Sequence, residues 1–215
     1  MKRIVILISG NGSNLEAVVN ACDSGQINGE VVSVISNNPD AYGIVRANKY
    51  NINTQIINHK KFESRLKFDD ELEKVLTVIN PDLIILAGFM RILGEKLINK
   101  YANKMINLHP SLLPEYPGLN THEQVLKNSD KKHGISIHFV TPELDAGPLI
   151  AQASIEVRND ETLDRLIERI HKIEHYLLPE IVREICLEKI FLDKNKTVKY
   201  AYADHESRFF VEIHE

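Results

Sequence analysis

Residues 3–14 read RIVILISGNGSN, an apolar run that passes directly into a loop of small and polar residues. The run from Arg3 to Ser9 is apolar without alternation, which is typical of a strand buried on both faces of a parallel sheet. After the loop, apolar side chains recur at the spacing of one helix face, at Leu15, Val18, Val19 and Cys22. The order of strand, loop and helix predicts the first unit of an α/β fold.

The same alternation of apolar runs and amphipathic stretches continues toward residue 90. Predicted strands cover 30–36, 54–58 and 83–87, and predicted helices cover 41–50 and 68–79. Pro81 ends the second of these helices, because proline cannot supply the backbone N–H that a helix interior needs. Two consecutive strand–helix–strand units are the minimum for a doubly wound sheet, and this chain supplies them.

The second half of the sequence is less regular. Strands are expected over 105–109, 134–141 and 149–157, and helices over 94–103, from residue 121, and over 161–188. Thr121 and Gln124 have the spacing of a capping box that opens the helix there. The polar segment after Ile190 predicts a hairpin between 190–192 and 198–202. Because no stretch of the sequence has the composition of a linker, we expect a single domain over 1–190, followed by a C-terminal hairpin or tail over 191–215.

Composition and charge exclude several classes of protein. Among 215 residues, 26 are Lys or Arg and 30 are Asp or Glu, which gives a net charge of -4 and argues against a surface that follows long nucleic acids. The apolar runs fall short of the roughly 20 residues that span a bilayer, and no cleavage pattern of a signal peptide is visible. We therefore expect a cytoplasmic protein with neither membrane nor nucleic acid as partner. Cys22 and Cys186 have no metal or redox spacing and are expected to stay reduced.

The loop from Gly10 to Asn14 is a candidate phosphate site. It lies between a strand and a helix, where backbone N–H groups and the positive end of the helix can hold an anion. Glycine permits close approach of the backbone, and Ser13 and Asn14 add side-chain donors. A dinucleotide is not expected, because its fingerprint needs a third glycine where this chain has Leu15. A plain, well-capped turn is the alternative interpretation.

Asn107 and His109 are two apart on a predicted strand and therefore point to the same face. Pro110 keeps His109 extended, at the end of the strand where α/β sheets bind ligands. Asp145 lies in the turn Leu-Asp-Ala-Gly-Pro, which is also consistent with a purely structural role. If the fold brings Asp145 near His109, its charge would favour an imidazolium that can donate a proton, and the amide would stabilise an oxyanion. Together they would form an acyl-transfer site without an enzyme nucleophile.

The stretch His171-Lys-Ile-Glu-His175 matches an inverted zinc-protease motif. On a helix, however, Glu174 falls inside the apolar stripe and His175 falls well outside it, so no metal site is expected. A carboxylate in an apolar stripe needs a partner, such as the hydroxyls or amine of a ligand. The alternative is a partly exposed Glu174 at a helix bend.

Two further stretches allow two interpretations each. His138 shares a strand face with Ser136 and either lines the same cleft or is a core histidine. Residues 89–93 follow the apolar strand 83–87, where backbone groups and aliphatic walls can hold a flat heterocycle. Ordinary core packing accounts for the apolar members of that segment almost as well.

Five stretches in this order resemble the glycinamide ribonucleotide formyltransferases, folate-dependent enzymes of purine biosynthesis: ISGNGSNLEA, PDLIILAGFMRIL, INLHPSLLPEYPG, HGISIHFVTPELDAGP and IEHYLLP. The resemblance covers about residues 1–180. It implies a three-layer α/β/α formyltransferase fold with a mostly parallel central sheet. Its Rossmann-like half over 1–100 would bind the nucleotide, and its half over 101–190 would carry catalysis and the folate.

The resemblance also implies a reaction and the residues that perform it. A formyl group would pass from 10-formyltetrahydrofolate, a co-substrate, to the amine of 5'-phosphoribosylglycinamide, with no metal, in a monomer or weak homodimer. Asn107 and His109 would support the tetrahedral intermediate, with His109 as proton donor to the departing folate nitrogen and Asp145 tuning it. The substrate would be bound by Gly12, Ser13 and Asn14 at its phosphate and by Glu174 at its ribose. The folate would be bound by Arg65, Met90, Arg91, Ile92, Leu93, Asn107, Val140, Thr141 and Asp145. Ala146 replaces a family glycine and permits fewer backbone conformations.

Other functions remain open at this stage. A formyltetrahydrofolate hydrolase would be expected to carry a further regulatory domain, and a methionyl-tRNA formyltransferase would be expected to carry a basic tRNA-binding domain. Neither domain is expected in a chain of 215 residues with a net charge of -4. A catalytically silent nucleotide- or folate-binding module would keep the loop at 12–14 without requiring Asn107, His109 and Asp145 together.

Overall fold

The computed structural model describes residues 1–213 and contains two sheets. The strands are β1 (Lys2–Ile8), β2 (Gly29–Ser36), β3 (Thr54–Ile56), β4 (Leu83–Ala87), β5 (Met105–His109), β6 (Lys132–Phe139), β7 (Leu149–Glu156), β8 (Ile190–Leu192), β9 (Val198–Tyr200) and β10 (Phe210–Ile213). The helices are α1 (Ser13–Asp23), α2 (Tyr42–Lys49), α3 (Arg65–Ile79), α4 (Glu95–Lys100), α5 (Thr121–Asn128), α6 (Leu163–Cys186) and α7 (His205–Phe209), with a 3-10 turn at His59–Lys61.

The main sheet has the order β10-β7-β6-β5-β4-β1-β2-β3. Strands β1 to β5 pair in parallel, β6 is antiparallel to both β5 and β7, and β10 returns parallel to β7. The prediction of a mostly parallel sheet is therefore confirmed. Short crossovers through helices connect the parallel strands, as right-handed α/β units require.

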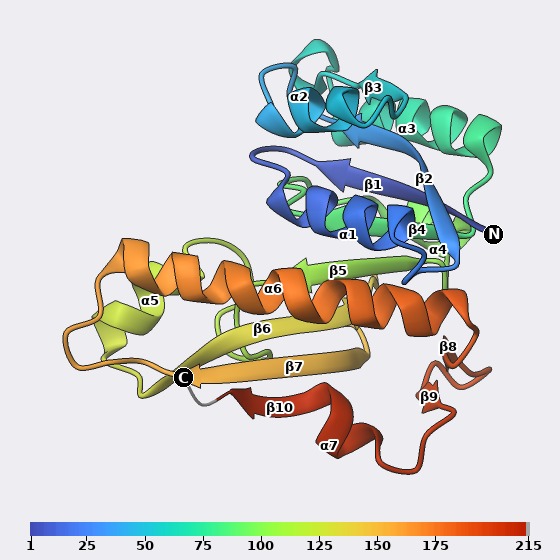
Figure 1. The fold of residues 1–215 in the computed structure, drawn as a ribbon. Helices are drawn as coiled ribbons and strands as arrows, with labels where there is room; N and C mark the ends of the chain where they lie inside the picture. Colours follow the sequence, from blue (N-terminus) through green and yellow to red (C-terminus); the bar gives the residue numbers. More distant parts are fainter. Residues whose placement is uncertain (214–215) are drawn as a thin grey trace.

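Helices cover both faces of this sheet and give three layers (Figure 1). Along β1, Ile4, Ile6 and Ile8 pack with α1 and α6, whereas Val5 and Leu7 pack with α3 and α4 on the opposite face. All five side chains are fully buried, which is why the run shows no polar alternation. The predicted α/β/α layering is confirmed.

The predicted capping box at α5 is wrong. Asn120 precedes the helix in a left-handed conformation with φ 58° and makes no side-chain cap. The Thr121 hydroxyl instead donates to the Pro110 carbonyl at 2.6 Å, and the Gln124 amide donates to the Leu119 carbonyl at 2.8 Å. Both side chains anchor α5 to the preceding loop, an interaction that local spacing does not reveal. The preceding helix is also shorter than the predicted 94–103, since α4 ends at Lys100.

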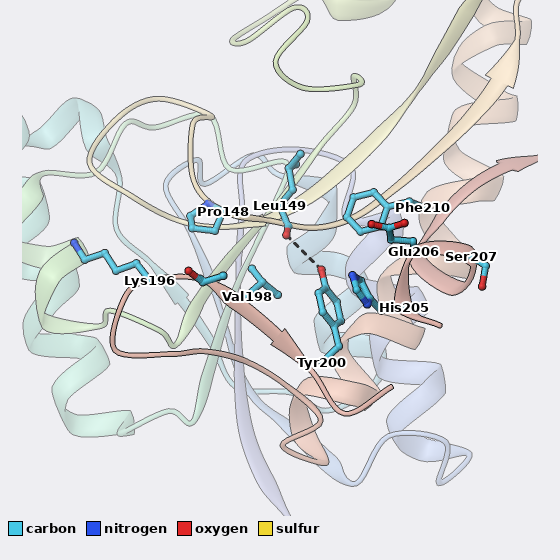
Figure 2. A pocket seen from close by; sticks show the side chains of 10 residues that line it. Pro148, Leu149, Lys196, Val198, Tyr200, His205, Glu206, Ser207 and Phe210 are labelled. Carbon is cyan, nitrogen blue, oxygen red and sulfur yellow. Dashed lines mark hydrogen bonds between the residues drawn. The ribbon is translucent and has the colours of Figure 1, made fainter. Parts of the chain in front are cut away.

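The C-terminal segment forms the expected hairpin and then extends the main sheet. Strands β8 and β9 pair antiparallel, and β10 adds an edge strand beside β7 that was not predicted. The Tyr200 hydroxyl donates to the carbonyls of Leu149 at 3.5 Å and Ile150 at 2.8 Å. Figure 2 shows Tyr200 and His205 lining an open pocket of about 850 Å³ at this junction. Residues 214 and 215 of the predicted tail lie outside the described residues.

Within residues 1–213, none of the helices combines the length and the apolar composition needed to cross a bilayer.

Candidate active site

Strand β5 ends at the centre of the site. Ile106 and Leu108 are buried in the core shared with α6, and the alternating residues Asn107 and His109 face the other way. His109 is itself buried, with 5% of its surface exposed.

The structure brings Asp145 to these two side chains. One carboxylate oxygen, Oδ2, lies 3.5 Å from Nδ1 of His109, and the other, Oδ1, accepts a hydrogen bond from the Asn107 amide at 3.3 Å. The backbone N–H of Gly118 also donates to Oδ2, at 2.8 Å. An amide, an imidazole and a carboxylate from two distant segments thus surround one point at the carboxyl end of β5.

The turn that presents Asp145 depends on its neighbours. Asp145 adopts a left-handed conformation with φ 50°, and a Cβ added at Gly147 would lie 1.7 Å from the Phe139 carbonyl oxygen. Glycine is therefore required at position 147. Ala146 is exposed and is not among the residues with positive φ, so the alanine fits this turn without backbone strain.

Asp145 is held as a carboxylate. Burial alone would raise its pKa, but the interaction with His138, the Gly118 N–H bond and the nearby His109 outweigh burial and lower the pKa below 3.8. A fixed negative charge therefore faces His109 at neutral pH.

The His109 ring lies between two acceptors. Its Nε2 is 2.9 Å from the Tyr116 carbonyl oxygen, while Nδ1 faces Asp145. Both ring nitrogens therefore face acceptors, and hydrogen bonds to both require a proton on each nitrogen. The geometry suits a proton donor.

His138 belongs to this site rather than only to the core. Its Nδ1 lies 2.9 Å from the Phe139 carbonyl, which leaves Nε2 to accept from the Asn107 amide at 3.1 Å. Asn107 thus donates to both His138 and Asp145. If Asn107 is to support an oxyanion, one of these two bonds must be exchanged for the substrate.

The candidate phosphate site, the loop 10–14 (the anion loop), depends on the close approach of two glycines, Gly12 in the loop and Gly43 on α2. Gly12 precedes α1 with φ 76°, and a Cβ there would lie 2.6 Å from the Cα of Gly43 on α2. From the same helix, the Arg46 guanidinium donates to the Asn11 carbonyl at 3.0 Å and pairs with Glu16. Arg46 was not predicted as part of this region, because its approach depends on how α2 packs against the loop.

Glu174 reaches the same end of the site from α6. It is buried, with 5% exposed, and it accepts a hydrogen bond at 2.8 Å from the Asn14 amide, so the two predicted halves of the domain meet here. The alternative of a partly exposed Glu174 at a bend is wrong, because α6 is continuous through this position. Within residues 1–213, the side-chain oxygen Oδ1 of Asn14 is buried and has no hydrogen-bond partner, which leaves it available to a donor group of a ligand.

The two histidines beside Glu174 do not converge on it. His171 and His175 are exposed, and their rings stack with centroids 6.1 Å apart. In the part of the chain that the structure describes, no group of three or more His, Cys, Asp or Glu side chains is placed to hold a metal.

A pocket of about 80 Å³ adjoins Asn107 and Asp145. Of the residues expected to hold the folate, it is lined by Arg91, Ile92, Leu93, Asn107, Val140, Thr141 and Asp145. Two others lie outside this lining. Met90 is 62% exposed and donates its backbone N–H to the Ser9 hydroxyl, and Arg65 is an exposed residue at the start of α3.

Removing the Glu174 charge should change how stability depends on pH. Burial raises the pKa of Glu174 to about 7, partly offset by the Asn14 bond, so the folded state binds this proton more tightly than the unfolded state. Its stabilising contribution is present below pH 4.5 and is lost as pH rises through 7. We expect the free energy of unfolding of Glu174→Gln, relative to that of the parent, to increase by about 3 kcal/mol when the pH is raised from 4.5 to 8. Urea unfolding at both pH values measures this, and a pH-independent difference would contradict it.

Comparisons with known proteins all point to one family of enzymes. Residues 2–182 match the family described as formyl transferase. The chain is 46% identical over 179 residues to the phosphoribosylglycinamide formyltransferase of Escherichia coli, covering 83% of this chain and 84% of that protein. It is 39% identical over 195 residues to the enzyme of that name from Haemophilus influenzae, covering 91% and 92%. The solved structure of the phosphoribosylglycinamide formyltransferase of Coxiella burnetii in complex with CHES superposes with a TM-score of 0.88 at 45% identity, over 93% of each chain.

Proposed function

The chain belongs to the formyl transferase family, and we propose that it transfers the formyl group of 10-formyltetrahydrofolate to the amine of 5'-phosphoribosylglycinamide. Membership of the family confirms the resemblance inferred from the five sequence stretches. The observation that carries the proposed reaction is the contact of Asn107, His109 and Asp145 at the carboxyl end of β5.

The proposed reaction is direct attack by the substrate amine. The amine nitrogen bonds to the formyl carbon, whose oxygen becomes an oxyanion near Asn107. The bond from the formyl carbon to the folate nitrogen then breaks, and His109 delivers the proton that this nitrogen needs as it departs. The attacking nitrogen loses a proton, which returns His109 to its protonated form, so the products are the formylated amide and tetrahydrofolate. Asp145 stabilises the imidazolium before it delivers its proton and after it regains one.

The nearby hydroxyls support attack by the substrate rather than by the enzyme. Ser111 donates to the carbonyls of Glu115 and Tyr116, at 2.6 and 3.2 Å, and Ser136 donates to the Ser111 carbonyl at 2.6 Å. Neither hydroxyl is hydrogen bonded to His109, which is the contact that an activated nucleophile requires.

We place the folate ring system against the segment 91–93. Within the described residues, the backbone N–H groups of Arg91, Ile92 and Leu93 make no hydrogen bond, so they are free to bind a heterocycle. The adjoining pocket of about 80 Å³, bordered by the exposed loop 142–144, would take part of the ring system.

The nucleotide is placed at the other end, with its phosphate on Gly12, Ser13 and Asn14 and its ribose on Glu174. The amino end of α1 supports the placement of the phosphate. The unsatisfied Oδ1 of Asn14 is an acceptor, so it supports a donating ribose hydroxyl beside Glu174 rather than a phosphate oxygen. The acting form is proposed to be a cytoplasmic monomer or weak homodimer that needs no metal.

A formyl-transfer assay tests the proposal. The purified chain is mixed with the ribonucleotide and 10-formyltetrahydrofolate, and tetrahydrofolate and the formylated nucleotide are both quantified. We expect the two products in equal amounts. Release of formate without the nucleotide would favour a hydrolase, and the absence of both products would favour a silent binding module.

Glu174→Ala should weaken nucleotide binding selectively. Loss of hydrogen bonds to a charged group costs about 1.5–3 kcal/mol, which corresponds to an increase of roughly 10- to 100-fold in the KM for the nucleotide. The KM for the folate should stay within about twofold, since the Asn14 contact of Glu174 lies at the anion loop. Glu168→Ala is the matched control, because Glu168 is exposed on the same helix and its carboxylate pairs with Lys172 at 3.1 Å. Equal losses for both substrates would count against a ribose contact.

A further inference from the structure

The anion loop offers backbone N–H groups that the protein itself does not use. Among the residues that the structure describes, no acceptor is found for the N–H groups of Gly12, Ser13 and Asn14, which lie just before or at the start of α1. Such groups bind an anion best when they are already held in one arrangement, because ordering a flexible loop on binding opposes affinity. The glycine at position 12 makes the loop flexible by itself, so contacts from outside must fix it.

Helix α2 makes those contacts. The N–H of Gly43 donates to the Gly10 carbonyl at 3.0 Å, beside the close approach of Gly43 to Gly12. Arg46 is three residues further along and therefore on the same face of α2. Its Nε donates to the Asn11 carbonyl at 3.0 Å, and Nη2 donates to Oδ1 of Asn11 at 3.1 Å. One guanidinium thus holds both the backbone and the side chain of Asn11.

The same guanidinium also reaches the other end of the loop. Its Nη1 pairs with the carboxylate of Glu16, in the first turn of α1. The pair is partly shielded from water, since the side chains of Arg46 and Glu16 are only 21% and 29% exposed. The Tyr42 ring covers the guanidinium, with Cζ of Arg46 5.1 Å from its centroid. Because Asn11 precedes the three free N–H groups and Glu16 follows them, Arg46 bridges the loop from end to end.

The charges of the pair indicate what it does. A carboxylate in the first turn of α1 opposes a phosphate bound at the same helix end, so Glu16 alone would weaken the site. Together, Arg46 and Glu16 add no net charge, and all three donor nitrogens of Arg46 are directed at protein acceptors. The pair therefore contributes to the shape of the loop rather than to its charge. Only the planar fork of an arginine can serve three acceptors in this way, which a lysine ammonium cannot.

We propose that Arg46 is a positioning residue for the phosphate of the nucleotide: by joining Asn11 to Glu16, it holds the N–H groups of residues 12–14 in the arrangement that binds the phosphate. This inference rests on the proposed function and adds a residue to the nucleotide side of the site.

The test measures nucleotide binding in two variants of Arg46. Arg46→Met removes the three contacts and the charge, whereas Arg46→Lys keeps the charge without the fork. The readouts are the Kd for 5'-phosphoribosylglycinamide by titration calorimetry, the KM for each substrate, kcat and thermal unfolding. We expect both variants to raise the Kd and KM for the nucleotide about tenfold or more, with the KM for the folate within about twofold of the parent. Lys49→Met, which removes an exposed cation of the same helix, is the matched control and should change none of these values.

Glu16→Ala separates positioning of the loop from direct attraction of the phosphate, because the two roles predict opposite signs. If Arg46 fixes the loop, losing its anchor weakens nucleotide binding, and we expect the Kd to rise about threefold or more. If Arg46 attracts the phosphate directly, removing the neighbouring acid would tighten binding instead.

Several results would overturn the inference. They are a parental nucleotide Kd in Arg46→Met, full recovery of that Kd in Arg46→Lys, and tighter nucleotide binding in Glu16→Ala. Equal rises in the KM for both substrates would assign Arg46 to the general stability of the fold. If Arg46→Met does not fold, Arg46→Lys and Glu16→Ala decide the question. Failure of the parent protein to bind the nucleotide would overturn the proposed function itself, whereas the other outcomes leave that function standing.

Discussion

His109→Ala is expected to lower kcat by about 10²-fold or more, with KM values changed far less. Within residues 1–213, the His109 imidazole lies against both Asp145 and the Tyr116 carbonyl, and in the proposed mechanism it carries the proton that the folate nitrogen needs. Without it, the C–N bond must break with an unprotonated amine as leaving group. The measurement is steady-state formyl transfer with both substrates varied.

A matched control separates this effect from a general loss of structure. His205→Ala removes an imidazole from the C-terminal segment, where the ring stacks on Tyr200 with centroids 4.2 Å apart. Its kcat should stay within about twofold of the parent, because distant substitutions act independently. Near-parental turnover in His109→Ala, with unfolding unchanged, would remove His109 from the mechanism.

The parts of the fold that were predictable are those with short-range signals. The continuous apolar run of β1 identified a central strand, and the two-residue spacing of Asn107 and His109 placed both side chains on one face. The match of five ordered stretches then identified the family. The first two inferences use only neighbouring residues, and the third uses short motifs that can each be recognised without knowing how distant segments pack.

The parts that were missed depend on packing between distant segments. Arg46 approaches the loop 10–14 from α2, and nothing in its local sequence marks a polar partner far along the chain. Gly118 contributes only a backbone N–H, which every non-proline residue has. Strand β10 has four residues and lies at an edge of the sheet, so its sequence shows little alternation of apolar and polar residues. Thr121 and Gln124 matched a capping motif, but tertiary contacts engaged both side chains.

Asp145→Asn is expected to lower kcat by about 10²-fold or more, although the substitution changes neither the size nor the shape of the side chain. Oδ2 of Asp145 meets two N–H groups, from Gly118 and His109, and Oδ1 meets the Asn107 amide. Whichever way the new amide is oriented, its NH₂ group faces another donor, and the charge that stabilises the imidazolium is gone.

The pH dependence of stability provides a second, independent readout of the same variant. The lowered pKa of Asp145 means that its stabilising contribution is present above pH 3.8 and is lost as pH falls through the folded-state value. Asp145→Asn should therefore be less stable than the parent at pH 7, and the difference should shrink toward pH 3. Asp160→Asn makes the same change at an exposed acid just before α6 and should show neither effect. A kcat for Asp145→Asn close to that of Asp160→Asn would mean that the carboxylate does not act through His109. If the stability difference shrank as predicted while kcat stayed high, Asp145 would be assigned to the structure of the turn alone.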